Sequence, residues 1–193
     1  MFIRRIRGYN AMGKFALGLI ILGLLLCWPE MVSAESPELL QAHRQGQDLE
    51  SKGHYKEAIP FALKALKLGE QEFGPDHNTT SILLNNLAEL YRTQGRYGDA
   101  EPLYRRSLEI WEKILGPEHR SVATSLNNLA LLYNDQGRYG DAEPLFKRSL
   151  AIKEKILGPE HLSVATSLNN LASLYKTQGR YGDAESLSKR ALA

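Results

Sequence analysis

The side chains with the clearest chemical potential in this sequence are three pairs of an acidic residue and a histidine. They are Asp76-His77, Glu118-His119 and Glu160-His161. A carboxylate beside an imidazole can transfer protons or bind a metal ion, but either role needs several such groups to converge on one point. These pairs recur instead every 42 residues. We therefore interpret them as parts of a repeated loop, and we expect no catalytic residue, no metal site and no cofactor.

Asparagine pairs are the second recurrent polar feature. The sequence Leu-Asn-Asn-Leu-Ala occurs three times, and each copy is followed by a Leu-Tyr. A side-chain amide both donates and accepts hydrogen bonds, so a row of amides can bind the main chain of an extended peptide. The first asparagines of the pairs are Asn85, Asn127 and Asn169, and the second are Asn86, Asn128 and Asn170.

An internal repeat positions these groups. Residues 84–125 match residues 126–167 at 34 of 42 positions, which establishes a duplication. A truncated copy follows at 168–193, and a diverged copy precedes them at 42–83. Residues 35–41 remain as a short lead segment.

Each copy has the pattern of two helices. Leu84, Leu87, Ala88 and Tyr91 have the spacing of one apolar helical face, and Gly95 is placed to end that helix. Pro102 is expected in the first turn of the second helix, where amide groups lack helical partners. No segment alternates in the way of a strand, so the sequence predicts an all-α fold. The apolar face of the second helix contains Ala100, Leu103, Tyr104, Leu108, Trp111, Ile114 and Leu115.

These motifs together resemble the tetratricopeptide repeat (TPR). The 42-residue period, with LNNLA, QGRY and LGPEH, is similar to the long repeats of kinesin light chain and its bacterial relatives. The resemblance implies an α-solenoid, a right-handed superhelix of antiparallel helix pairs with about 3.5 repeats. Repeats of this kind in kinesin light chain bind short cargo peptides in a groove, so the resemblance also implies a non-catalytic protein or peptide-binding role.

The face of the first helix that the resemblance places in the concave groove carries the candidate binding residues. Helical geometry puts the first asparagine opposite the packing residues, beside positions that differ among the copies. We expect the asparagines to bind ligand main chain and the varied positions to select ligand side chains. The predicted groove residues are Asn85, Asn127, Asn169, Glu89, Arg92, Leu131, Asn134 and Lys176.

Other interpretations of this face remain open. The asparagines can satisfy adjacent helix ends or loops, while the varied positions drift freely. Arg92 and Lys176 can pair with an acidic ligand group or remain solvated. The second asparagine of each pair points toward one edge of the groove, which makes it the weaker candidate.

The N-terminus has the pattern of an export signal. A basic start precedes the apolar run at residues 15–28, and Val32-Ser33-Ala34 offers small residues for cleavage after Ala34. The sequence predicts a signal peptide at 1–34 and a periplasmic or secreted protein. The alternative is an uncleaved membrane anchor, although the run is shorter than the roughly 20 residues that span a bilayer. Cys27 is the only cysteine, so the mature chain would contain no disulfide.

The charge balance limits the partners. Without residues 1–34 the chain has 20 basic and 21 acidic residues, mixed along its length. This balance predicts no nucleic-acid partner, and no membrane partner once the signal is cleaved. The alternative to ligand binding is a structural or self-assembling scaffold, including a homo-oligomer through the uncapped C-terminal repeat, or a fragment of a larger multi-repeat protein.

Overall fold

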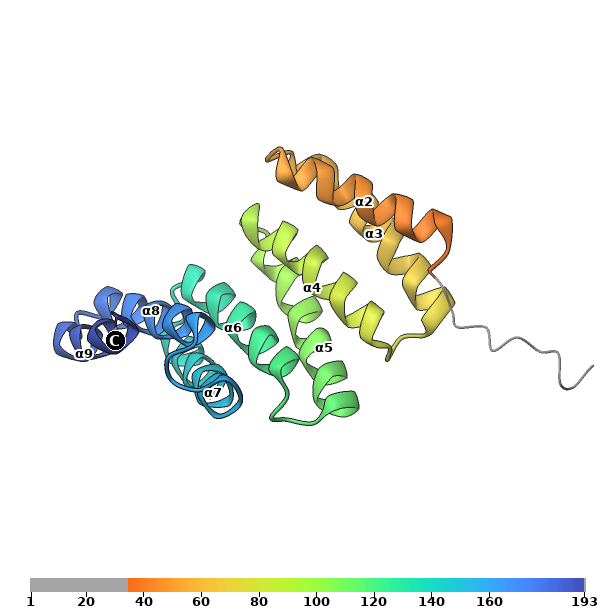
Figure 1. Cartoon of the computed structure of the whole chain (residues 1–193). Helices are drawn as coiled ribbons and strands as arrows, with labels where there is room; N and C mark the ends of the chain where they lie inside the picture. Colours follow the sequence, from red (N-terminus) through yellow and green to blue (C-terminus); the bar gives the residue numbers. More distant parts are fainter. Residues whose placement is uncertain (1–34, 193) are drawn as a thin grey trace, which may run out of the picture. The chain divides into compact units, whose positions relative to one another are not determined.

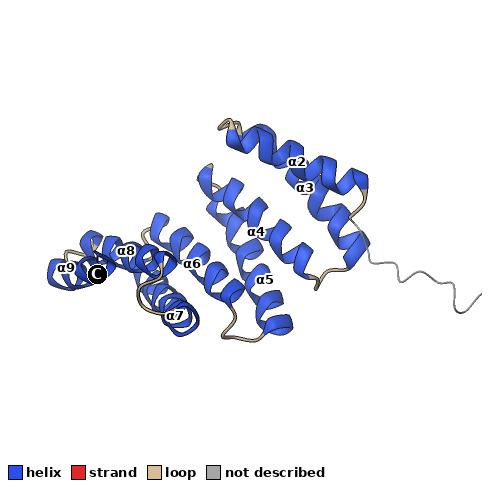
Figure 2. Ribbon diagram, in the orientation of Figure 1, coloured by secondary structure: helices blue, strands red, loops and turns tan. Residues whose placement is uncertain are grey.

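Eight α-helices make up the part of the chain that the computed structural model describes, residues 35–192 (Figures 1 and 2). No strand occurs within these residues. The predicted signal peptide at 1–34 lies outside the described residues. The helices are α2 (Pro37–Ser51), α3 (Tyr55–Phe73), α4 (Asn78–Thr93), α5 (Tyr97–Leu115), α6 (Arg120–Asp135), α7 (Tyr139–Leu157), α8 (Leu162–Thr177) and α9 (Tyr181–Leu192).

The helices form four hairpins that stack in chain order. Within the hairpins α2 packs on α3, α4 on α5, α6 on α7 and α8 on α9, and successive hairpins meet through α3–α4, α5–α6 and α7–α8 (Figure 1). The predicted all-α solenoid is confirmed. Its hairpins begin at 78, 120 and 162, ahead of the repeat starts at 84, 126 and 168. A sequence period determines the length of a repeat but not its first residue.

Polar caps determine where the first helix of each hairpin begins. Ser36 caps α2 by accepting a hydrogen bond from the Leu39 amide at 3.1 Å, with Pro37 at the first helical position. Residues 37–41 therefore belong to α2 and do not form a separate lead segment. His77, His119 and His161 cap α4, α6 and α8 in the same way, through Nδ1.

The second helix of each hairpin follows a glycine turn. Gly95 has a φ of 69°, in the left-handed region where a residue with a Cβ is strained, and Tyr97 begins α5 two residues later. Pro102 lies deeper in α5 than expected, at its sixth residue. Because proline has no N–H, the carbonyl of Gly98, four residues earlier, receives no helical hydrogen bond from it.

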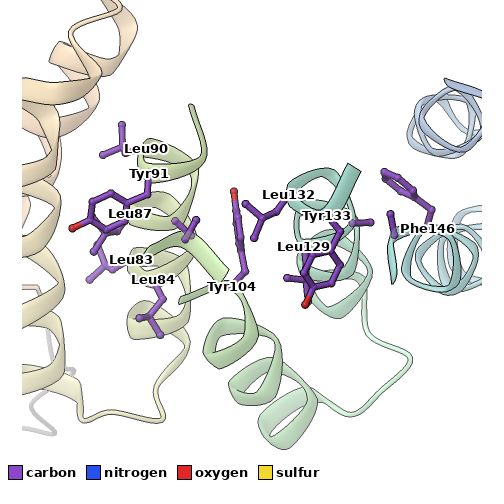
Figure 3. Close-up of a cluster of buried hydrophobic side chains, with 14 of the residues drawn as sticks. Leu83, Leu84, Leu87, Leu90, Tyr91, Tyr104, Leu129, Leu132, Tyr133 and Phe146 are labelled. Carbon is purple, nitrogen blue, oxygen red and sulfur yellow. The ribbon is translucent and has the colours of Figure 1, made fainter. Parts of the chain in front are cut away.

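The core runs along the stack from hairpin to hairpin. Leu84, Leu87 and Ala88 are fully buried as predicted, and Figure 3 shows the buried leucines of α4 together with Tyr104 of α5. Ile114 and Leu115 differ from the prediction, because both are more than 40% exposed. They lie in the last turn of α5, where the apolar pattern continues but no neighbouring helix covers the side chains.

Side-chain volumes at the hairpin interfaces are complementary. Gly69 of α3 faces Leu83 of α4, and a Cβ on Gly69 would lie 2.5 Å from Leu83 Cδ1. One period later the large residue is on the other side, since Trp111 of α5 lies in one hollow with Ser125 of α6. At these two interfaces the large and the small residue are thus exchanged between the two helices.

We predict that Gly69→Ala destabilises the protein, although alanine is the better helix former by about 1 kcal/mol. Overpacking against Leu83 should cost about 1–3 kcal/mol, measured by urea unfolding. Leu83→Ala in the same chain should remove most of that penalty, giving a favourable coupling energy of about 1 kcal/mol or more. Gly98→Ala is the matched control, because nothing lies within 4 Å of its added Cβ. Additive effects of the two substitutions would contradict the packing interpretation.

Candidate binding surface

Asparagine side chains bond to one another across the hairpins. Asn128 donates from Nδ2 to Oδ1 of Asn85 at 3.0 Å, and Asn170 donates in the same way to Asn127 at 3.0 Å. Asn127 Nδ2 also lies 3.5 Å from Oδ1 of its neighbour Asn128. We call this row, Asn85, Asn127, Asn128 and Asn170, the asparagine ladder. Each rung links the first asparagine of one hairpin to the second asparagine of the next.

The first hairpin joins the ladder through a histidine. His43 stands one period before Asn85, and Asn86 Nδ2 lies 3.3 Å from its Nε2 atom. The second asparagines, the weaker binding candidates from the sequence, therefore have structural partners. Sequence reasoning missed this bond because it joins residues 43 positions apart on different helices.

The ladder determines which atoms of the first asparagines remain available. Oδ1 of Asn85 is occupied by Asn128, whereas its Nδ2 atom has no partner among the described residues. Asn85 and Asn127 are half-buried, and Asn169, with no described hairpin beyond it, is exposed. The amide groups that remain are mainly donors, which suit acceptor atoms on a ligand.

Glu89 and Arg92, both predicted groove residues, are instead occupied within the protein. Tyr104 donates to Glu89 Oε2 at 2.6 Å, and Arg92 Nη2 lies 2.5 Å from Glu89 Oε1. Arg92 also bonds to Asp135 at the end of α6. Burial alone would raise the pKa of the Glu89 carboxyl, but the bonds from Arg92 and Tyr104 lower it. This network joins α4, α5 and α6.

The equivalent positions in the next hairpin are apolar. Leu131 replaces Glu89 and packs against the core, while Phe146 replaces Tyr104. The carboxylate and the hydroxyl are thus present together in one hairpin and absent together in the next. Two of the positions that differ between copies, 89 and 104, are therefore bonded to each other inside the protein.

The last two predicted groove residues differ in their surroundings. Asn134 is half-buried, and its Oδ1 atom is buried without a hydrogen-bond partner among the described residues. Lys176 is exposed near the end of α8 and has no ion-pair partner in the described part of the chain.

A hollow of about 250 Å³ lies between α4 and α6, beside the ladder. Ile82 and Asn85 line it from α4, and Trp111 reaches it from α5. The remaining lining residues, Ser121, Thr124 and Ser125, belong to α6. Sequence reasoning assigned Trp111 to the core and so missed it here. The sequence contained a signal for this position, because 111 is one of the few positions at which the two full copies differ.

A second polar network joins α5 to α6 and to the loop that precedes α7. The carboxylate of Glu101 accepts hydrogen bonds from Tyr133 at 2.9 Å and from Arg138 at 2.9 Å. The Arg138 guanidinium also lies over the Tyr133 ring, 4.1 Å from its centroid. The contacts recur one hairpin later with Glu143, Tyr175 and Arg180. The tyrosines that close the second and third Leu-Asn-Asn-Leu-Ala motifs, Tyr133 and Tyr175, are thus interface residues.

The histidine of every acidic residue–histidine pair caps a helix, and in two of the three loops the acid also forms an ion pair. Glu118 pairs with Lys155 at 2.6 Å, and Asp76 pairs with Lys113. No cluster of three or more potential metal ligands occurs among residues 35–192. Within the same residues, no helix is both long and apolar enough to span a membrane.

A family model described as the tetratricopeptide repeat matches this chain three times, over residues 38–113, 79–155 and 121–193. The chain belongs to the tetratricopeptide repeat family. Repeats of this family are in general protein–protein interaction modules, and their fold is typically non-catalytic.

Solved structures with this fold are kinesin light chain-like TPR proteins, as the resemblance implied. BtubC (BKLC) from P. vanneervenii superposes with a TM-score of 0.74 at 22% identity, over 93% of this chain and 72% of that chain. A putative kinesin light chain of Podosopora anserina with nearly identical TPR-like repeats gives a TM-score of 0.68 at 23% identity, over 94% of this chain and 86% of that one. A second structure of that protein gives 0.71 at 23% identity, over 93% and 84%. No curated protein sequence matches the chain.

We predict that Glu89 and Tyr104 are energetically coupled. Tyr104→Phe removes one of the donors to the Glu89 carboxylate and leaves Arg92 as its partner, and Glu89→Leu leaves a buried hydroxyl without an acceptor, so each should cost about 1–3 kcal/mol. The double variant reproduces the Leu131–Phe146 pair of the next hairpin and should cost less than the sum by about 1 kcal/mol or more. Urea unfolding at neutral pH measures all three. If the double variant loses as much stability as the two single variants together, Glu89 and Tyr104 are not coupled.

Proposed function

We propose that this protein binds an extended peptide or protein segment, without catalysis, along the face formed by α2, α4, α6 and α8. The observation that carries the proposal is the asparagine ladder. It holds the Asn85 side chain by its oxygen and leaves Nδ2 as a donor beside the hollow between α4 and α6. A carbonyl of an extended main chain accepts from such a donor, and a neighbouring ligand side chain can enter the hollow beside Trp111.

The residues of this face divide by role under the proposal. Asn85, Asn127 and Asn169 contact ligand main chain. Glu89 and Arg92 hold α4, α5 and α6 together. Because their charges are paired inside the protein, they shape the face but offer no free charge to the ligand. The identity of the ligand depends on the side chains around the ladder.

The test separates the donor atoms of the asparagines from their structural bonds. Asn85→Asp keeps an oxygen for Asn128 but has no N–H, and Asn169→Ala removes an amide outside the ladder. Both should weaken binding to peptides selected from an array of random dodecapeptides, by about tenfold for each lost hydrogen bond.

Asn78→Asp is the matched control, since it makes the same chemical change at an exposed position of α4 away from the ladder. The control should bind as the unchanged protein does. Full binding by Asn85→Asp and Asn169→Ala variants of normal thermal stability would remove these residues from the site.

Self-association is a second candidate function, favoured by one exposed face. Tyr97 and Tyr139 pack against the core, whereas their counterpart Tyr181 on α9 is 71% exposed. If a second copy covers this face, light scattering should show a dimer at micromolar concentration, and Tyr181→Ser should return it to monomer. A monomer at all micromolar concentrations would exclude this candidate.

For residues 1–34 we propose a cleaved export signal, supported by the basic start, the apolar run and the small residues before Glu35. N-terminal sequencing of the protein from its native cell should then begin at Glu35. A mature N-terminus at Met1 would favour the membrane anchor instead.

A further inference from the structure

A second hollow, of about 430 Å³, lies among α5, α6 and α7. It is larger than the hollow beside the asparagine ladder and shares no lining residue with it. The residues of α6 that line it are Leu129 and Tyr133, whereas the ladder uses Asn127 and Asn128. The rest of its lining comes from α5, from α7 and from the turn that precedes α7. This hollow therefore lies apart from the residues that carry the proposed peptide-binding face.

Apolar side chains form part of the lining. They are Leu108 of α5, Leu129 of α6, and Pro144 and Leu145 of α7. Leu129 is buried, and Leu108 and Leu145 are partly buried against the core. A ligand side chain with an aliphatic stem can cover the exposed parts of these residues.

The positive charges around the hollow are already paired within the protein. Arg105 donates to Glu101 at 2.9 Å and to the hydroxyl of Tyr133 at 2.6 Å. Arg138 pairs with Glu101 and with Asp141, each at 2.9 Å. Both guanidinium groups are thus neutralised by carboxylates of the chain itself.

One carboxylate in the hollow is not paired in this way. Glu109 of α5 makes no ion pair and no side-chain hydrogen bond within residues 35–192, whereas Glu112, one turn later, pairs with Arg148 at 2.7 Å. The counterparts of Glu109 one period away are Lys67 and Ala151. A free negative charge at this position is therefore specific to α5.

A main-chain acceptor lies in the same hollow. Because Pro144 has no N–H, the carbonyl of Gly140 receives no helical hydrogen bond from it. Both residues line the hollow. The Gly140 carbonyl and the Glu109 carboxylate suit a ligand group that is positively charged and has several N–H donors.

We infer that this hollow binds a lysine or arginine side chain of a partner protein, with Glu109 pairing with its charged end. The aliphatic stem of such a side chain packs on Leu108 and Leu145, while the cationic group bonds to the carboxylate. A lysine occupies the equivalent position in α3 and an alanine that in α7, so the preference belongs to this place in the stack. The inference is independent of the proposed peptide-binding face, because the two surfaces share no residue.

The experiment measures binding of the full chain to an array of random dodecapeptides that are acetylated and amidated, so that only side chains carry charge. Bound peptides are resynthesised with each lysine replaced in turn by norleucine, and each arginine by citrulline. Both replacements keep the stem and remove the charge. We expect a group of peptides in which one basic residue contributes about fivefold to affinity, and this contribution should decrease with added salt.

Charge variants assign that contribution to the hollow. Glu109→Gln should abolish it. Glu160→Gln is the matched control, because it makes the same change at an exposed loop residue outside the hollow, and it should leave the contribution intact. Asn85→Asp, on the other surface, should also leave it intact.

Gly140→Leu tests whether the ligand side chain enters the hollow. A Cβ added at Gly140 has nothing within 4 Å, so the fold accommodates a larger residue there, and the leucine fills part of the hollow. The same peptides should bind about fivefold more weakly or worse. Gly98→Leu makes the same change at the equivalent position of α5, again with nothing within 4 Å of the Cβ, and should bind them as the unchanged protein does.

The two proposals fail separately. If no peptide on the array depends on Glu109, or if a Gly140→Leu variant of normal thermal stability binds those peptides fully, the hollow is not a binding site and the proposed function is unaffected. Peptides that lose affinity in the Glu109→Gln variant but not in Asn85→Asp and Asn169→Ala support the hollow alone.

Discussion

The packing of each helical hairpin on the next is the constraint on which the rest of this structure depends. One hairpin of about 38 residues exposes an apolar face on both sides and cannot bury them alone, so neighbours complete the core. Leu84, Leu87 and Ala88 are fully buried for this reason. The pairs Gly69–Leu83 and Trp111–Ser125 show that the large residue comes from different helices at two successive interfaces. Near-identical sequences thus form interfaces that are similar but not interchangeable.

Polar groups follow the same interfaces. The asparagine ladder bonds one first helix to the next, and the Glu101–Tyr133–Arg138 network bonds second helices to the following hairpin. Both recur because the interface recurs. Asparagines and glutamates that repeat with the period, such as Asn85 and Asn127 or Glu101 and Glu143, therefore make the same bond at successive interfaces.

Much of the architecture could be predicted because helices leave local signals. The spacing of Leu84, Leu87 and Ala88, the glycine at 95 and the strict period were sufficient for the all-α repeat fold and its family. The candidate site was less accessible. Glu89 and Arg92 belong to the predicted face, but their partners Tyr104 and Asp135 lie on other helices. Helical geometry places a side chain on a face without revealing what reaches it from a neighbouring helix.

By itself, the sequence of this protein determined its helices, its period and the residues that pack inside each hairpin, since these depend on neighbours within one or two turns. Only the tertiary structure decided which atoms remain available for a ligand. Asn85 illustrates the difference. Its type and position were evident from the repeat, but the bond from Asn128, 43 residues later, occupies its oxygen and leaves its nitrogen as the donor. That choice depends on the stacking of two hairpins, and no local pattern contains it.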